Sequence, residues 1–117
     1  MSKILPNPKD AKEQLNKLRE AFVKGAVNEI NSSVTFCAIL GILATLSTIN
    51  SGELLEVFKN IFTSNLKNLK GDPSKVGLPA ETSQFINIDE TIDNIAGSYL
   101  GVVESLLESY KKDNARK

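Results

Sequence analysis

Apolar residues recur at steps of three and four along most of the chain, which is the spacing of an amphipathic helix. Asn7 followed by Pro8 is a typical helix start, because an N-cap residue precedes a proline in the first turn. Glu13 lies four residues before Lys17, a favourable pairing on the solvent side of a helix. The pattern therefore predicts a first helix over residues 8–30. Its apolar stripe consists of Ala11, Leu15, Leu18, Phe22, Ala26 and Ile30.

The next segment, residues 30–52, contains no charged residue. Its "NSS" at 31–33 can cap a new helix over about 33–49, or the first helix can continue through it with a bend. On a helical wheel one face is bulky and the other is small, and a small face lets a neighbouring backbone approach closely. The bulky face holds Phe36, Ile39, Leu40, Ile42, Leu43, Leu46 and Ile49. The small face holds Ser33, Cys37, Gly41, Ala44, Thr45 and Thr48.

Two further amphipathic segments follow. The first predicts a third helix over about 52–70. Gly71 is expected to end this helix as its C′ residue, and Pro73 prevents the helix from continuing. Asn87 with Glu90 resembles a capping box, so a fourth helix is expected over about 88–111. The loop 71–87 between them is longer than the about 4 to 6 residues typical of a compact domain. Residues 112–117 form a short basic tail.

Residues 34–49 raise the question of a membrane, because a transmembrane helix needs about 20 mostly apolar residues. Three observations weigh against a membrane span. Polar residues shorten the apolar run, the flanking charges Glu29 and Glu53 are acidic rather than basic, and no Trp or Tyr marks either end. The apolar stripes of the other predicted helices also need an apolar surface to pack against, which a central apolar helix would supply. We therefore expect one all-α domain, a compact bundle of about four helices around a central, mostly buried apolar helix at about 33–49. A helix that inserts into a bilayer is the alternative.

The chain offers few residues for chemistry. It contains no histidine, which removes the commonest general base and the commonest metal ligand. The single Cys37 has no cationic neighbour in sequence, so it fits a small buried hydrophobe. Fourteen basic residues balance fourteen acidic ones, whereas binding the phosphate backbone of a nucleic acid requires a clustered excess of basic residues. We expect no catalytic residues, no metal, no cofactor and no nucleic-acid partner.

Two features of the sequence are not needed for the monomer to fold. The loop 71–87 carries Val76 and Leu78, which could be presented to a partner, and Phe85, which is expected to fold back over the core. Gly97 and Gly101 form a GxxxG pair on the polar side of the last helix, where each glycine costs about 1 kcal/mol relative to alanine. The residues expected to contact a partner are Val76, Leu78, Gly97, Gly101 and Ser105.

Together these patterns predict a non-enzymatic helical interaction protein, such as a subunit, an adaptor or a small inhibitory or immunity-type protein. Its partner would be another protein or a second copy of the chain. The first residues lack the apolar run of a secretory signal, and a lone cysteine fits a reducing compartment, so an intracellular, cytoplasmic location is expected. The alternative is a membrane-associated helical protein whose residues 34–49 insert into or span a bilayer. A carrier of an apolar ligand between helices is a third possibility.

Overall fold

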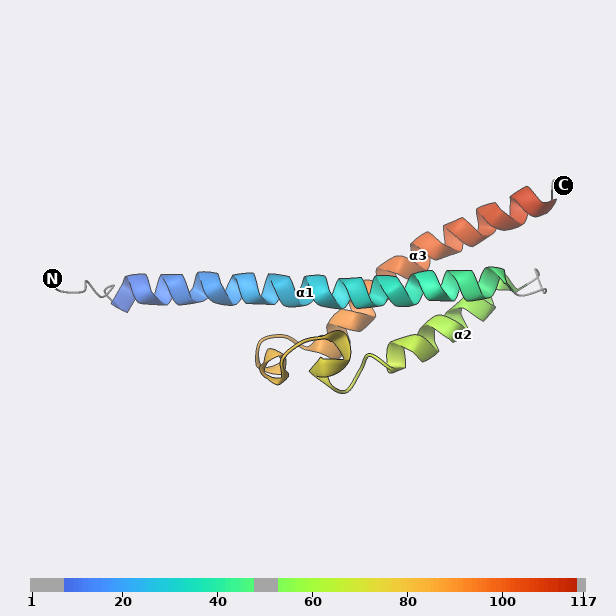
Figure 1. Ribbon diagram of the computed structural model, residues 1–117. Helices are drawn as coiled ribbons and strands as arrows, with labels where there is room; N and C mark the ends of the chain where they lie inside the picture. The colour runs from blue at the N-terminus through green and yellow to red at the C-terminus, as the bar shows by residue number, and fades with distance from the viewer. Residues whose placement is uncertain (1–7, 48–52, 116–117) are drawn as a thin grey trace.

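A computed structural model describes residues 8–47 and 53–115 of the chain. In this part of the chain the regular elements are three α-helices and two short 3-10 helices. They are α1 (Pro8–Leu46), α2 (Leu54–Lys67), η1 (Pro73–Val76), η2 (Ala80–Gln84) and α3 (Ile88–Ala115). Helix α1 is the long axis of an elongated molecule of 78 × 27 × 21 Å, and α2 and α3 pack along one half of it (Figure 1). The N-terminal half of α1 extends past them.

The prediction of two separate helices over 8–30 and 33–49 is wrong, and the continuous alternative is confirmed as far as Leu46. Residues 31–33 include neither proline nor glycine, so nothing in the backbone breaks the helix there. Thr35 donates its hydroxyl proton to the carbonyl oxygen of Asn31, 2.7 Å away, which satisfies this polar side chain inside the helix. The all-α class is confirmed, but the described residues form three α-helices rather than about four.

The other helices begin near the predicted positions, but α2 ends at Lys67, before the expected end at 70, with Asn68 as its C-cap. Gly71 has a φ of 95°, a conformation that favours glycine, and it follows the last turn after α2. The side chain of Asn87 accepts a hydrogen bond from the Glu90 N–H at 3.1 Å, which caps α3 as predicted. Helix α3 then continues to Ala115, beyond the expected end at 111. The predicted cap Asn7 lies outside the described residues.

The loop 71–87 is structured rather than open. Asp72 caps η1 by accepting a hydrogen bond from the Ser74 N–H at 2.9 Å, and this bond lowers the pKa of the Asp72 carboxyl. Gly77 ends η1 with a φ of 76°. Phe85 folds back onto α1 rather than over the core: its ring, 45% exposed, meets Phe22 edge to face with 5.4 Å between centroids. The loop therefore covers the middle of α1.

The core lies between α1 and the pair α2 and α3. Its largest fully buried apolar side chains are Ile30, Val34, Phe58, Phe62 and Ile92. Helix α1 contributes its small face, and a Cβ atom added at Gly41 would lie 2.9 Å from Cε1 of Phe58. The Phe58 ring stacks on Phe62 with 5.1 Å between centroids. Close approach of α2 at Gly41 therefore determines which face of α1 turns inward.

The expectation of a central, mostly buried helix at about 33–49 is wrong in consequence. In the most apolar 18-residue window of α1, 33% of the residues are buried in the structure. The small face contacts α2 and α3, while most of the bulky face points to solvent. This arrangement leaves large apolar side chains without a partner inside the monomer.

Candidate functional site

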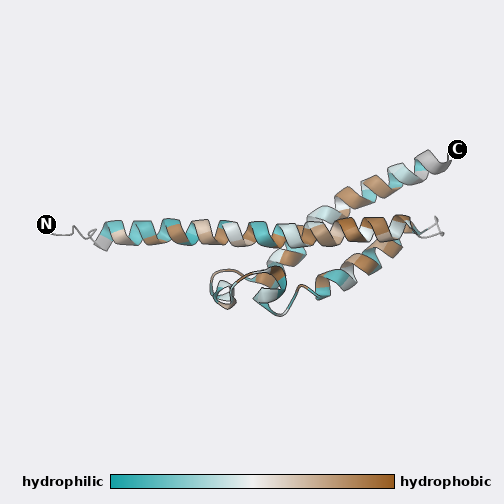
Figure 2. Ribbon diagram, viewed as in Figure 1, coloured by the Kyte–Doolittle hydropathy of each residue, from teal (hydrophilic) through white to brown (hydrophobic). Residues whose placement is uncertain are grey.

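The bulky side of α1 forms an exposed surface that we call the outer apolar face. Its four residues are Phe36, Ile39, Leu40 and Leu43, with exposed fractions of 62%, 50%, 43% and 61%. They lie at steps of three and four, so they share one side of the helix. Figure 2 shows the hydrophobic residues of α1 concentrated in the half that lies beside α2. An exposed apolar cluster of this kind is typical of an interaction site.

The opposite side of the same helical turns explains why these residues face outward. Ala38, Gly41 and Thr45 are small enough for close packing against the rest of the core. Thr45 is fully buried, and its hydroxyl donates to the Gly41 carbonyl oxygen at 2.6 Å, so its polar atom is satisfied there. The bulky residues would not fit at this distance. The outer apolar face is thus a result of the packing on the small face.

The first turns of α1 form a second exposed surface, residues 9–24, which we call the arm. Every residue from Lys9 to Phe22 is exposed. Three large apolar residues, Leu15, Leu18 and Phe22, are nevertheless 56%, 68% and 38% exposed. Phe22 touches Phe85, and the Arg19 guanidinium lies 5.9 Å from the centre of the same ring. Toward the N-terminus from this contact, the described chain places no other element against the arm (Figure 1).

A groove lies between the start of α2 and the last turns of α3. It has a volume of about 520 Å³, and Leu54, Leu55 and Leu107 give it an apolar floor. Its rim is acidic and consists of Glu53, Glu56, Glu104 and Glu108. The groove exists because α3 diverges from α2 as it crosses α1 (Figure 1). We call it the acidic-rimmed groove.

The structure distributes the predicted contact residues over different environments. Val76 is 3% exposed and belongs to the core, so the expectation that it is presented to a partner is wrong. Leu78 is half-buried and packs against the core. Gly97, Gly101 and Ser105 are exposed on α3, and added Cβ atoms at the two glycines would meet nothing within 4 Å. Contact of these three residues and Leu78 with a partner stays a prediction.

The sequence patterns did not single out a polar cluster that joins α1 to α3. The Tyr99 hydroxyl donates to Oδ1 of Asn31 at 3.1 Å and also lies within hydrogen-bonding distance of Thr35 Oγ1. On the surface, Lys70 forms an ion pair with Asp93, which connects the end of α2 to α3. These groups are hydrogen-bonded to each other, and their role is to hold the helices together. The acidic-rimmed groove was also missed, because its two sides are distant in sequence.

Cys37 is expected to react slowly with a thiol reagent in the folded protein. It is 6% exposed on the inward face of α1, and burial raises the pKa of its thiol, which lowers the thiolate fraction at a given pH. We expect slow labelling in native buffer and fast labelling in denaturant, followed by absorbance of the released chromophore. Equal rates in the two conditions would contradict the burial of Cys37.

Among the described residues, no group of three or more histidine, cysteine, aspartate or glutamate side chains is arranged to hold a metal ion. One helix, Lys9–Leu46, is long and apolar enough to cross a membrane by length and composition alone. Neither a protein family nor a curated protein nor a solved structure shows significant similarity to this chain.

Proposed function

We propose that this chain is a helical interaction protein that acts by contact, as a subunit, adaptor or inhibitory protein, and that its outer apolar face is covered by another protein. The observation that carries the proposal is the exposure of Phe36, Ile39, Leu40 and Leu43 on one side of α1. Burying a large apolar side chain is worth about 1.5–3 kcal/mol. A partner that covers this face therefore gains considerable free energy from a small area.

The absence of charge around this face also supports a contact role. Residues 30–46 of α1 contain no ionisable side chain other than the buried Cys37. A partner would not need to strip water from a charged group there, which is the main cost of burying polar surfaces. The fold behind the face is held by side chains on the opposite side of α1. The face can thus bind without any rearrangement of the core.

A membrane is the second candidate partner for this face, because the exposed residues belong to the uncharged segment 30–52. A span would require α1 to leave α2 and α3, which carry exposed charged residues such as Lys59 and Lys67. That separation would expose Ile30 and Val34, both fully buried in the fold. A helix lying on a bilayer surface would keep these contacts. The membrane candidate is therefore adsorption of the outer apolar face.

The test is the double variant Phe36→Ser and Leu43→Ser, with Val102→Ser as the matched control. Val102 is 64% exposed on α3, outside the outer apolar face. We expect the double variant to stay folded and to lose the proteins that co-purify with the parent chain from its source cells, while the control retains them. Flotation with anionic lipid vesicles separates the two candidates. Flotation of the parent but not the double variant, without a protein partner, would favour the membrane.

A further inference from the structure

We propose that the acidic-rimmed groove receives the arm of a second copy of this chain, so that two copies form a closed dimer. This inference concerns surfaces other than the outer apolar face and does not rest on the proposed function. It begins from two unexplained features that lie on one molecule. One is an exposed helical segment with apolar and basic residues, and the other is an apolar groove bordered by carboxylates.

The arm has the composition of a docking helix. At about 100° per residue, Leu15, Leu18 and Phe22 share one side of α1. Lys12 and Arg19 border this stripe on one side, whereas Lys17 and the three acidic residues of the arm lie toward the opposite side of the helix. An isolated helix of this length is marginal in water and gains its stability from packing. The arm therefore fits a partner surface that is apolar in the middle and negative along an edge.

The acidic-rimmed groove has this character. Glu53 and Glu56 lie on the α2 side, Glu104 and Glu108 lie on the α3 side, and its lining residues include no lysine or arginine. Carboxylates that face one another across a groove repel, and a basic helix placed between them replaces this repulsion by attraction. The floor of Leu54, Leu55 and Leu107 would meet the apolar stripe of the arm. Apolar and charged contacts then favour the same occupant.

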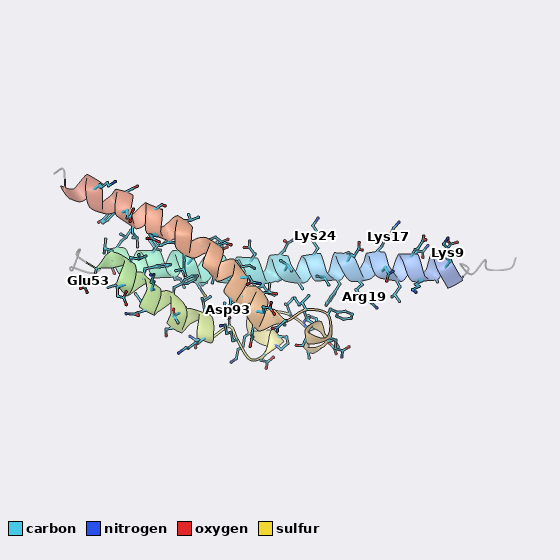
Figure 3. All side chains as sticks on the ribbon, turned by 180° about the vertical axis from the view of Figure 1, so that it is seen from behind. Lys9, Lys17, Arg19, Lys24, Glu53 and Asp93 are labelled. Atoms are coloured by element: carbon cyan, nitrogen blue, oxygen red, sulfur yellow. The ribbon has the colours of Figure 1, made fainter. Side chains whose placement is uncertain are left out.

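The arm cannot reach the groove of its own molecule. Figure 3 shows Lys9 and Lys17 at one end of the structure and Glu53 at the other. Helix α1 is continuous between them, and its rise of about 1.5 Å per residue separates the arm from the groove by on the order of 40 Å. A second copy turned about a two-fold axis places each arm at the other copy's groove. The same contact then forms twice, as in other isologous dimers.

Charge reversal tests this arrangement directly. One variant carries Lys12→Glu and Arg19→Glu, which makes the edge of the arm's stripe acidic, and the other carries Glu104→Lys and Glu108→Lys, which makes the groove basic. All four positions are exposed, so the fold should be retained. By sedimentation equilibrium the parent should reach twice the 12.7 kDa chain mass. Each variant alone should dimerise at least about tenfold more weakly, since close interfacial charge pairs couple by more than about 1.4 kcal/mol.

Mixing the two variants is the decisive step. In the mixture the acidic arm of one chain faces the basic groove of the other, and the basic arm of the second faces the acidic groove of the first. The mixed sample should therefore recover the parent's dimer affinity, and this affinity should fall with added salt. The control variant Lys59→Glu and Lys67→Glu, on exposed α2 positions outside the groove, should dimerise as the parent does.

Three results would overturn the proposal. The first is a parent chain that stays monomeric up to millimolar concentration. The second is a dimer that both charge-reversed variants form as tightly as the parent. The third is a mixture that does not recover the lost affinity. Loss of the dimer in the Phe36→Ser and Leu43→Ser variant, with the charge-reversed variants unaffected, would instead place the contact between copies on the outer apolar face.

Discussion

A chain carrying Val34→Asp is expected to be unfolded at room temperature. Val34 is fully buried in the core, between α1 and the other helices. A carboxylate at this position would lose its water without gaining a partner, which costs several kcal/mol even after its pKa rises and it becomes neutral. Natural domains of this size are stable by only about 5–15 kcal/mol. Far-UV circular dichroism and urea denaturation of the purified chain would measure the loss.

Phe36→Asp is the matched control, because it introduces the same carboxylate two residues further along the same helix. Phe36 is 62% exposed, so the new charge would stay hydrated and the free energy of unfolding should change by no more than about 0.5 kcal/mol. The pair therefore reports which side of α1 faces the core. If Phe36→Asp unfolded the isolated chain and Val34→Asp did not, the packing of α1 would be the reverse of the one described.

The second large effect is expected from Phe58→Ala. Phe58 is fully buried, stacks on Phe62 and lies against Gly41. Removing a buried phenylalanine ring costs about 3–5 kcal/mol, because the transfer free energy is lost and a cavity remains. Urea denaturation should show a lower midpoint with little change in slope. A loss below about 1 kcal/mol would mean that α2 does not pack on α1 at this point.

Gly41→Ala tests whether Gly41 and Phe58 are in direct contact. In the parent chain the new methyl group would lie 2.9 Å from the Phe58 ring, so overpacking of about 1–3 kcal/mol should exceed the gain of about 1 kcal/mol in helix propensity. In the Phe58→Ala background the ring is gone, and the same change should become neutral or stabilising. Gly97→Ala, where nothing lies within 4 Å, should stabilise in either background. Equal effects of Gly41→Ala in both backgrounds would show that the two residues do not interact.

Local signals in the sequence were sufficient for the start of α3, but not for the ends of α2 and α3. Asn87 acts within three residues, so its capping role could be predicted without tertiary information, whereas α2 ends at Lys67, four residues before Gly71. The segment "NSS" was ambiguous, since these residues can cap a helix or lie within one. Hydrogen bonding of Thr35 to Asn31 and packing of Val34 against the core favour the continuous helix. The contacts with α2 and α3 are the part of this outcome that the sequence pattern does not contain.

The exposed surfaces were harder to predict. The sequence shows a bulky face and a small face in α1, but hydrophobicity alone favours burial of the bulky one. The choice depends on how closely α2 approaches at Gly41, and that distance is a property of the pair of helices. The acidic-rimmed groove likewise unites Glu53 with Glu108, which are far apart along the chain. A pattern within one segment has no information about such pairs.

The continuity of α1 also has a dynamic consequence. One covalent helix contains two regions with different free energies of opening: its first turns have few contacts with other elements, while its later turns open only when α2 and α3 detach. Fraying that starts at the N-terminus must therefore stop near Ala26 and Ile30, where α1 enters the core. The same helix therefore has an N-terminal end that melts easily and a later part that stays rigid. Any contact that orders the arm would add to helix length without changing the state of the core.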